Sequence, residues 1–388
     1  MSNLPLNWST DYVTQTASVL KSNNFVVLCD LTKRHSLKEY FLQKNRDRIM
    51  PYMMNSILIY NFVNYLPFKR FLFITKANEF INAALLKLVT RVIGIIKGKS
   101  TTVIWTFDPR FYSFYKEFKK INYTIIYDCV DYFAGSTLDP QESIWVKNEE
   151  KKLLQLADYV FTISYTLKRL HQRVRKNIYV VPQGFRLETF HENGKVTLVK
   201  KFPKNKPIIG YIGGINFRLD YKLIYELASL FKNYSFVFAG PIQADTSHFI
   251  KFGMPYISKL KQLSNVYFIG SISKNQIPYL IDQFSVGIIP YSSTFTFNRF
   301  SYPMKLFEYF YSGKPVISSQ IDELRRFKNY VFIATDKNKW IRLLQELTNK
   351  KWPEINKQRQ RQLAINNSWK NKIDAIEDIL TEDFKKNN

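Results

Sequence analysis

The 388-residue sequence is poor in cysteine, histidine and acidic residues, and it has no long hydrophobic run. Its 2 cysteines exclude a disulfide framework and a cysteine-rich zinc cluster, and they predict a reducing, cytoplasmic compartment. A membrane-spanning helix needs roughly 18–20 apolar residues, but the most apolar stretch, residues 81–96, is interrupted by Lys87 and Arg91. The first residues lack the basic and apolar segments of a secretory signal peptide, so we expect none.

The shortage of acidic residues leaves a large positive charge. The chain has 57 Lys and Arg against 31 Asp and Glu, a net charge of +26, which predicts an anionic partner. Residues 33–99 carry 13 basic and 3 acidic residues, interleaved with large apolar ones. This pattern favours a protein that binds peripherally to an anionic membrane, here the inner face of the cell membrane. Ordinary solvent-exposed helices would give a similar sequence pattern. Nucleic acid is not expected, because no helix-turn-helix, zinc-finger or RNP-like pattern occurs.

Short apolar runs alternate with helical stretches along the whole chain, which predicts an α/β protein with parallel sheets covered by helices. A chain of this length is expected to form two domains. Strands are expected in the first half at residues 24–31, 56–62, 100–107, 123–130, 159–164 and 178–184. The polar, proline-containing residues 191–206 predict a linker, after which the alternation restarts at residue 207.

Two local patterns in the second half indicate an anion site. Gly213 and Gly214 follow an apolar strand and precede a helix, where glycines let a phosphate approach the positive helix end. Lys305 and Glu308 lie three residues apart, so they share one helix face. The alternative for the two glycines is a tight turn that binds no ligand. The alternative for Lys305 and Glu308 is an ion pair on the surface.

Three aspartates follow strands of the first half, where a parallel sheet presents its ligands. Asp131 lies in the loop after the strand at 123–130, and it is the candidate base that takes a proton from an acceptor hydroxyl. Helix capping is its alternative role. We expect Asp128 to be structural, and Asp108 to form a local turn with Arg110 beside it as a possible contact for an anionic acceptor.

Several segments in order resemble nucleotide-sugar-dependent glycosyltransferases of the GT-B fold, families 1 and 4, and especially those of bacterial surface polysaccharides. They are IIYDCVDYFAG, VVPQGFRLETF, GYIGGINFRLDYKLIYELA, NVYFIGSISKNQIPYLIDQFSVGIIPY and SYPMKLFEYFYSGKPVISS. The resemblance implies two Rossmann-like domains facing a cleft. The expected division is an acceptor domain at 1–190, a nucleotide-sugar domain at 207–365, and a final helix at 366–388 that returns to the first domain.

The resemblance also implies roles for individual residues. Glu308 would bind the ribose hydroxyls and Lys305 the diphosphate, with no metal or other cofactor. The remaining residues assigned to the nucleotide sugar are Gly213, Gly214, Arg218, Arg299, Tyr302 and Met304. Many retaining relatives carry two glutamates eight residues apart, but Phe300 stands at the first of these positions.

The departure at Phe300 favours inverting transfer with Asp131 as base. The expected reaction moves a sugar, with a UDP-sugar as the favoured donor, to a lipid-linked or polysaccharide acceptor. A retaining transferase and a non-catalytic nucleotide-sugar-binding protein remain the alternatives.

Overall fold

The computed structural model divides into two compact units, residues 1–181 with 373–388 and residues 182–372. It describes residues 12–36, 51–67, 71–98, 101–190, 202–203, 205–243 and 249–386. Most of the linker expected at 191–206 lies outside these residues. Residues 182–190, which we expected to close the first domain, are grouped with the second unit.

The first unit contains a parallel sheet with the order β4-β5-β6-β7. Its strands are β4 (Val103–Thr106), β5 (Thr124–Cys129), β6 (Tyr159–Thr162) and β7 (Tyr179–Val180). β5 is buried along nearly its whole length, because apolar side chains on both faces are covered, as expected for a central parallel strand. Polar loops follow the carboxyl ends of β4, β5 and β6, and all three ends lie at one edge of the sheet.

A second, three-stranded sheet of this unit has the order β1-β3-β2, from β1 (Val27–Ser36), β2 (Tyr52–Met54) and β3 (Ile57–Asn64). The expected strands at 24–31 and 56–62 are therefore present, but β2 was not expected. Asn55 and Ser56 have φ of 49° and 63° and form the two-residue loop of a tight hairpin. Two consecutive positive φ values fit the right-handed twist of paired strands, so β2 runs antiparallel to β3.

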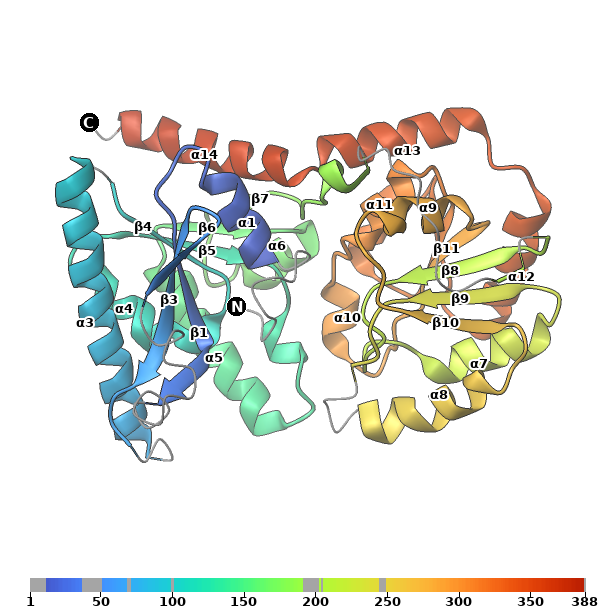
Figure 1. Ribbon diagram of the computed structural model, residues 1–388, viewed down its shortest axis with the longest axis horizontal. Helices are drawn as coiled ribbons and strands as arrows, with labels where there is room; N and C mark the ends of the chain where they lie inside the picture. Colours follow the sequence, from blue (N-terminus) through green and yellow to red (C-terminus); the bar gives the residue numbers. More distant parts are fainter. Residues whose placement is uncertain are drawn as a thin grey trace. The chain divides into compact units, whose positions relative to one another are not determined.

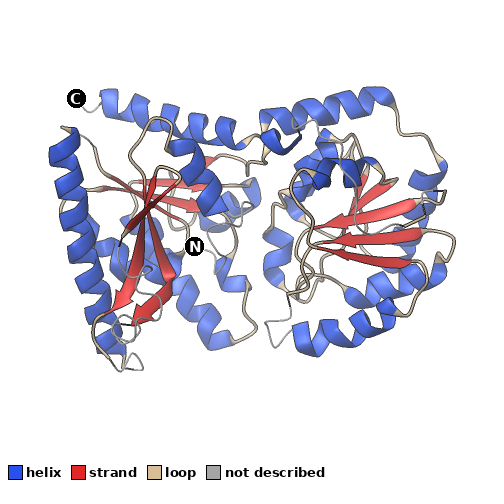
Figure 2. Cartoon of the chain, viewed as in Figure 1, coloured by secondary structure: helices blue, strands red, loops and turns tan. Residues whose placement is uncertain are grey.

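Helices pack on the strands of the first unit (Figures 1 and 2). They are α1 (Tyr12–Leu20), α3 (Leu72–Lys97), α4 (Tyr112–Lys119), α5 (Pro140–Leu156), α6 (Tyr165–His171) and the short 3₁₀ turns η2 (Pro109–Phe111) and η3 (Phe133–Gly135). The last helix, α14 (Trp369–Lys386), begins in the second unit and continues in the first. Ile376 and Leu380 of α14 pack on Ile126, Phe161 and Val181.

The second unit is built on one parallel sheet with the order β10-β9-β8-β11-β12-β13. Its strands are β8 (Ile208–Ile212), β9 (Ser235–Ala239), β10 (Val266–Gly270), β11 (Val286–Ile289), β12 (Val316–Ser318) and β13 (Val331–Ile333). In chain order this is 3-2-1-4-5-6, the doubly wound order of dinucleotide-binding folds. The order reverses between β8 and β11, and ligands of such sheets bind at the carboxyl ends beside that point.

The helices of the second unit lie on both faces of its sheet, with α7 and α8 on one side and α9 and α11 on the other (Figure 1). Buried residues of α7 recur at helical spacing, from Tyr221 to Ile224 and Leu227, and Asp220 caps the helix by accepting from the Leu223 amide at 3.0 Å. The bounds are α7 (Tyr221–Leu230), α8 (Met254–Lys261), α9 (Gln276–Asp282), α10 (Thr296–Phe300), α11 (Lys305–Tyr311), α12 (Lys337–Asn349), α13 (Glu354–Asn366), and the short turns η4 (Leu187–Phe190), η5 (Phe249–Gly253) and η6 (Asp322–Phe327).

Candidate active site

The loop after β8 has a backbone conformation and packing that require glycine. Gly213 is exposed with φ of 119°, and its amide donates to the Ala239 carbonyl at 2.9 Å. Gly240, after the neighbouring strand β9, has φ of 145°, and a Cβ there would lie 2.0 Å from the Gly213 carbonyl oxygen. The two loops therefore touch backbone to backbone at the carboxyl edge of the sheet. Gly240 was not identified from the sequence, because its close partner comes from another strand.

Lys305 begins α11 and points at this glycine loop. Its Cε lies 3.1 Å from the position that a Cβ on Gly213 would take. Its ammonium donates to the Tyr291 hydroxyl at 2.8 Å and lies 4.9 Å from the Tyr211 ring centroid. Burial by itself lowers the pKa of Lys305, but the phenol oxygens of Tyr211 and Tyr291 raise it, and the net shift is upward. A cation is thus held beside the exposed glycine backbone.

Glu308 lies one turn after Lys305 on the same face of α11 and is half-buried. Burial raises the pKa of Glu308 to about 7, and the charge of Lys305 acts in the opposite direction. Among the residues that the structure describes, none donates a hydrogen bond to this carboxylate. A half-buried carboxylate with unused acceptor oxygens can accept from the hydroxyls of a ligand.

Arg218 is held by contacts from two distant segments. Its guanidinium lies 4.7 Å from the Tyr291 ring centroid and 4.6 Å from that of Phe297, and it donates to Asn298 Oδ1 at 3.1 Å and to the Ser301 hydroxyl. Tyr291 also contacts Lys305, so one aromatic ring separates the two cations. Arg218 was proposed from the sequence, but the side chains that hold it, among them Tyr291 and Asn298, lie more than 70 positions later and give no local sequence signal.

The other residues assigned to the nucleotide sugar make fewer contacts with the group formed by Gly213, Lys305 and Arg218. Arg299 is exposed and forms an ion pair with Asp322 at 2.7 Å. Tyr302 is buried in the core against Phe307 and Phe327, so we now interpret it as a packing residue. Met304 is half-buried at the start of α11, and Gly214 lies in the loop, with Gln243 Oε1 only 2.6 Å from where its Cβ would be.

The aspartates of the first unit differ strongly in environment. Asp131 is half-exposed in the loop after β5, and its Oδ1 accepts from the Tyr132 amide at 3.0 Å. Asp128 is fully buried within β5. Asp108 is also fully buried, and both its oxygens accept from the Arg110 guanidinium. Asp131 is therefore the aspartate of the three that solvent or an acceptor can reach.

A buried polar cluster that sequence analysis did not identify lies beneath the Asp131 loop. It consists of Cys129 at the end of β5, Glu150 on α5 and His171 on α6, all at most 5% exposed. Tyr127 donates to Glu150 Oε1 at 2.7 Å. Burial raises the pKa of Glu150 to about 7 and lowers that of His171 to about 4. No local sequence motif links Cys129 to the other two residues.

The long helix α3 of the first unit exposes an apolar stripe. Asn82 and Asn78 orient the helix, because they bond the backbone of Val63 and Leu66 at the end of β3. The outward side chains, which we call the α3 face, are Phe73, Phe80, Leu88, Val92, Ile95 and Ile96, between 46% and 82% exposed. Lys76, Arg91 and Lys97 are exposed on the same helix. No helix among the described residues has the length and apolar character needed to cross a membrane.

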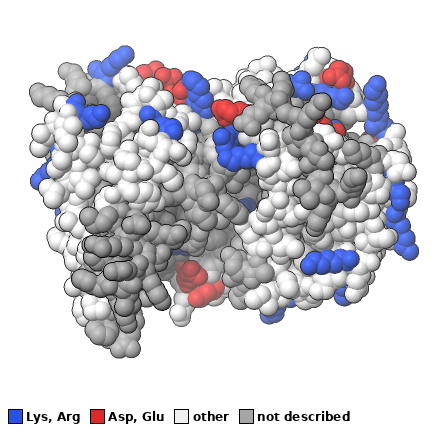
Figure 3. Space-filling model, in the orientation of Figure 1, with Lys and Arg blue, Asp and Glu red and all other residues white. Residues whose placement is uncertain are grey.

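Lys87 does not belong to the α3 face, although it lies on the same helix as Arg91 and Lys97. Its side chain is 17% exposed and lies 3.8 Å from Glu117 and 5.7 Å from the Phe118 ring centroid. On the side drawn in Figure 3, basic side chains are spread out and do not form one patch. The α3 face is therefore distinguished by exposed apolar area combined with positive charge, not by charge alone.

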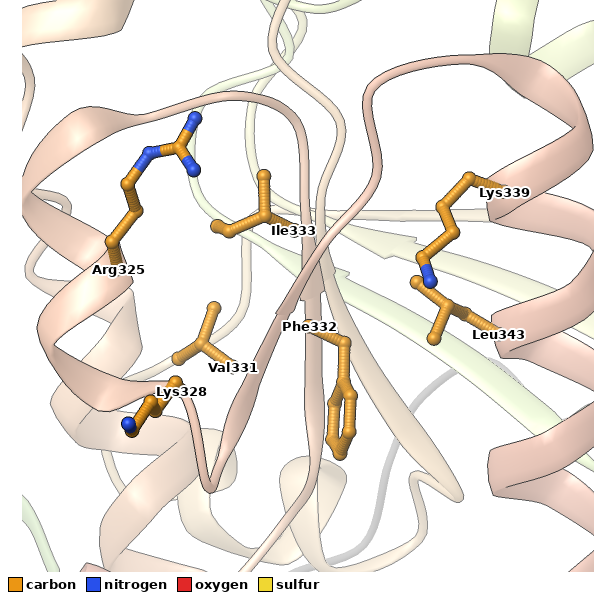
Figure 4. A pocket seen from close by; sticks show the side chains of 7 residues that line it. All are labelled: Arg325, Lys328, Val331, Phe332, Ile333, Lys339 and Leu343. Carbon is orange, nitrogen blue, oxygen red and sulfur yellow. The ribbon is translucent and has the colours of Figure 1, made fainter.

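A pocket in the second unit lies at the outer strand β13, away from the point where the strand order reverses. Val331, Phe332 and Ile333 of β13 line it together with Leu343, and Arg325, Lys328 and Lys339 surround it (Figure 4). Arg325 is also 3.7 Å from Asp322. Because β13 is an edge strand, two strands away from β11, we do not include this pocket in the site.

The chain is also similar in sequence to known proteins. Residues 197–361 match the family model of glycosyl transferases group 1. TuaH of Bacillus subtilis (strain 168), whose name assigns it as a glycosyltransferase of teichuronic acid biosynthesis, is 26% identical over 260 residues, which span 63% of this chain and 64% of that protein.

Solved structures share the fold of the whole chain. Sucrose-phosphate synthase from Thermosynechococcus elongatus matches with a TM-score of 0.70 and 14% identity, over 96% of this chain and 93% of that one. Anabaena HepE, in complex with UDP-glucose, matches with a TM-score of 0.68 and 11% identity over 98% of each chain. The chain therefore has the GT-B fold, its residues 197–361 match the model of glycosyl transferases group 1, and it is similar to bacterial polysaccharide glycosyltransferases.

Proposed function

We propose that the protein transfers a sugar from a nucleoside diphosphate sugar to a lipid-linked or polysaccharide acceptor. The observation that carries this proposal is the grouping of Lys305, Arg218 and Glu308 at the carboxyl edge of the second sheet, beside the exposed backbone of Gly213. Lys305 and Arg218 counter the charge that develops on the leaving diphosphate, which preorganised cations can do without rearrangement. Glu308 accepts from the ribose hydroxyls.

A UDP-sugar is the favoured donor. The similarity to HepE, whose structures are in complex with UDP and with UDP-glucose, supports this choice. The similarity to TuaH supports an acceptor of the polysaccharide class. A screen of UDP-, GDP- and other nucleotide sugars for binding and turnover tests both points. Saturable binding of every nucleotide sugar without hydrolysis or transfer to any acceptor would favour the non-catalytic alternative.

We further propose inverting transfer with Asp131 as the base. Asp131 is the most accessible of the three strand-end aspartates, whereas Asp108 is neutralised by Arg110. In the second unit, Phe300 stands where retaining relatives carry the first glutamate of their pair. Asp322, on η6, is paired with Arg299. NMR of the product gives the anomeric configuration directly. A retained configuration would refute the role of Asp131 as an inverting base.

We also propose that the α3 face docks on an anionic membrane, where lipid-linked acceptors reside. Phe80, Ile95 and Ile96 are 57%, 82% and 74% exposed, which is costly in water and favourable at a lipid interface. Arg91 and Lys97 on the same helix attract anionic headgroups.

Liposome flotation with anionic and zwitterionic vesicles tests the docking proposal. Replacing Ile95 and Ile96 by serine removes two apolar side chains and should weaken binding at least about tenfold. The matched control is the pair Leu230→Ser and Ile250→Ser in the second unit, which are 58% and 59% exposed. Equal binding of both double variants, or binding independent of salt and of anionic lipid, would refute docking through α3.

A further inference from the structure

The buried cluster of the first unit has the composition of a metal site. Cys129, Glu150 and His171 come from three different elements, β5, α5 and α6 (Figure 1), and offer sulfur, carboxylate oxygen and imidazole nitrogen. They form the one group of three such residues found within the described parts of the chain. These are the three ligand types that Zn²⁺ prefers in proteins.

The spacing of the three ligand atoms matches that of a tetrahedral ion. Cys129 Sγ lies 3.6 Å from His171 Nε2 and 3.8 Å from Glu150 Oε1, and the last two atoms are 3.6 Å apart. Metal–ligand bonds of about 2.3 Å to sulfur and about 2.0–2.1 Å to nitrogen and oxygen require edges of about 3.3–3.6 Å. A point central to these atoms is therefore at bonding distance from all of them, with small adjustments.

The surroundings of the cluster also suit a cation. Tyr127 donates to Glu150 Oε1 at 2.7 Å, which is the kind of outer hydrogen bond that orients a carboxylate ligand. Burial raises the pKa of the Cys129 thiol, and the negative charges of Glu150, Asp128 and Asp131 raise it further, so the cluster gathers negative charge that a cation would offset. The Asp131 carbonyl oxygen accepts from the Cys129 thiol at 3.5 Å, which links the cluster to the loop after β5.

We propose that Cys129, Glu150 and His171 form a Zn²⁺ site that ties α5 and α6 to the carboxyl end of β5. The ion would fix the loop that begins at Asp131, two residues after Cys129, and would take no part in the transfer step. The proposal stands on the first unit alone and does not depend on the proposed reaction. Binding converts the thiol to a thiolate, and the released proton goes to solvent.

Cobalt substitution of the full chain tests the site. The chain is treated with chelator, dialysed, and titrated with Co²⁺. We expect one equivalent to bind with a thiolate-to-cobalt charge-transfer band, which Zn²⁺ then displaces. Cys129→Ala should abolish the band, whereas Cys29→Ala, which removes the other buried cysteine, should retain it.

Thermal unfolding gives a second measurement. Zn²⁺ should raise the melting temperature of the wild type and of Cys29→Ala, but not of Glu150→Gln or His171→Gln. Tyr127→Phe should bind Zn²⁺ roughly 10–100-fold more weakly, as expected for the loss of an outer-shell partner. The proposal is overturned if the wild type shows no thiolate–metal band, or if Cys129→Ala and Cys29→Ala behave alike. The cluster would then be a hydrogen-bonded part of the core.

Discussion

The charge of Lys305 provides the most discriminating test of the nucleotide site. Lys305→Met keeps most of the apolar stem of the side chain, but it removes the ammonium that lies beside Gly213 and over the Tyr211 ring. A hydrogen bond to a charged group contributes about 1.5–3 kcal/mol. We therefore expect the variant to bind UDP about 10–150-fold more weakly than the wild type, since each 1.4 kcal/mol corresponds to a factor of ten.

Uridine has no phosphate, so its affinity should change by less than about threefold in Lys305→Met. Calorimetric titration with UDP, GDP and uridine measures these differences. Lys314→Met is the matched control, because Lys314 is also half-buried in the same unit but donates to the Asp282 carbonyl at 2.7 Å. Equal losses for UDP and uridine, or the same loss of UDP affinity in the Lys314 variant, would show that Lys305 does not bind the diphosphate.

Three further predictions concern the pH dependence, the chemistry and the fold. Burial raises the pKa of Glu308 to about 7, so its ionised fraction grows between pH 6 and pH 8. Because the carboxylate accepts from the ribose hydroxyls, UDP-glucose affinity should rise roughly tenfold over that range in the wild type and stay constant in Glu308→Gln. An affinity that falls with rising pH would contradict this role of Glu308. Asp131→Asn should lower kcat by about 10²–10⁴-fold with donor affinity nearly unchanged, measured by initial rates and titration, and turnover close to wild type would place the base elsewhere. Gly240→Ala should lower the free energy of unfolding by about 2–5 kcal/mol, because the new Cβ would lie 2.0 Å from the Gly213 oxygen. Gly270→Ala, at a position with positive φ but open space, should lower it by only about 1–2 kcal/mol, and denaturant titrations measure both values.

The sequence by itself determined the features that depend on neighbouring residues. The expected strands at 56–62, 123–130 and 159–164 are present as β3, β5 and β6, because runs of buried apolar residues encode a covered strand locally. The turn at Gly213 and the shared helix face of Lys305 and Glu308 are likewise properties of a few consecutive residues. The doubly wound class of the chain followed from the alternation of such elements.

Only the tertiary structure decided which distant residues meet. Arg218 is held by Tyr291 and Asn298, which follow it by more than 70 positions, and Gly240 is required by a carbonyl on another strand. The hairpin at Asn55 and Ser56 adds the antiparallel strand β2, which we did not predict from the sequence.

The same limit explains the residues whose roles changed. Tyr302 lies next to the site in sequence but packs in the core, and Lys87 turns inward to Glu117 although its neighbours on α3 face outward. Cys129, Glu150 and His171 are separated by about 20 residues each and become neighbours because Glu150 on α5 and His171 on α6 both contact Cys129, the last residue of β5. Local sequence determines where each strand and helix forms, whereas these contacts depend on the order of the strands within the sheet, which no single segment encodes.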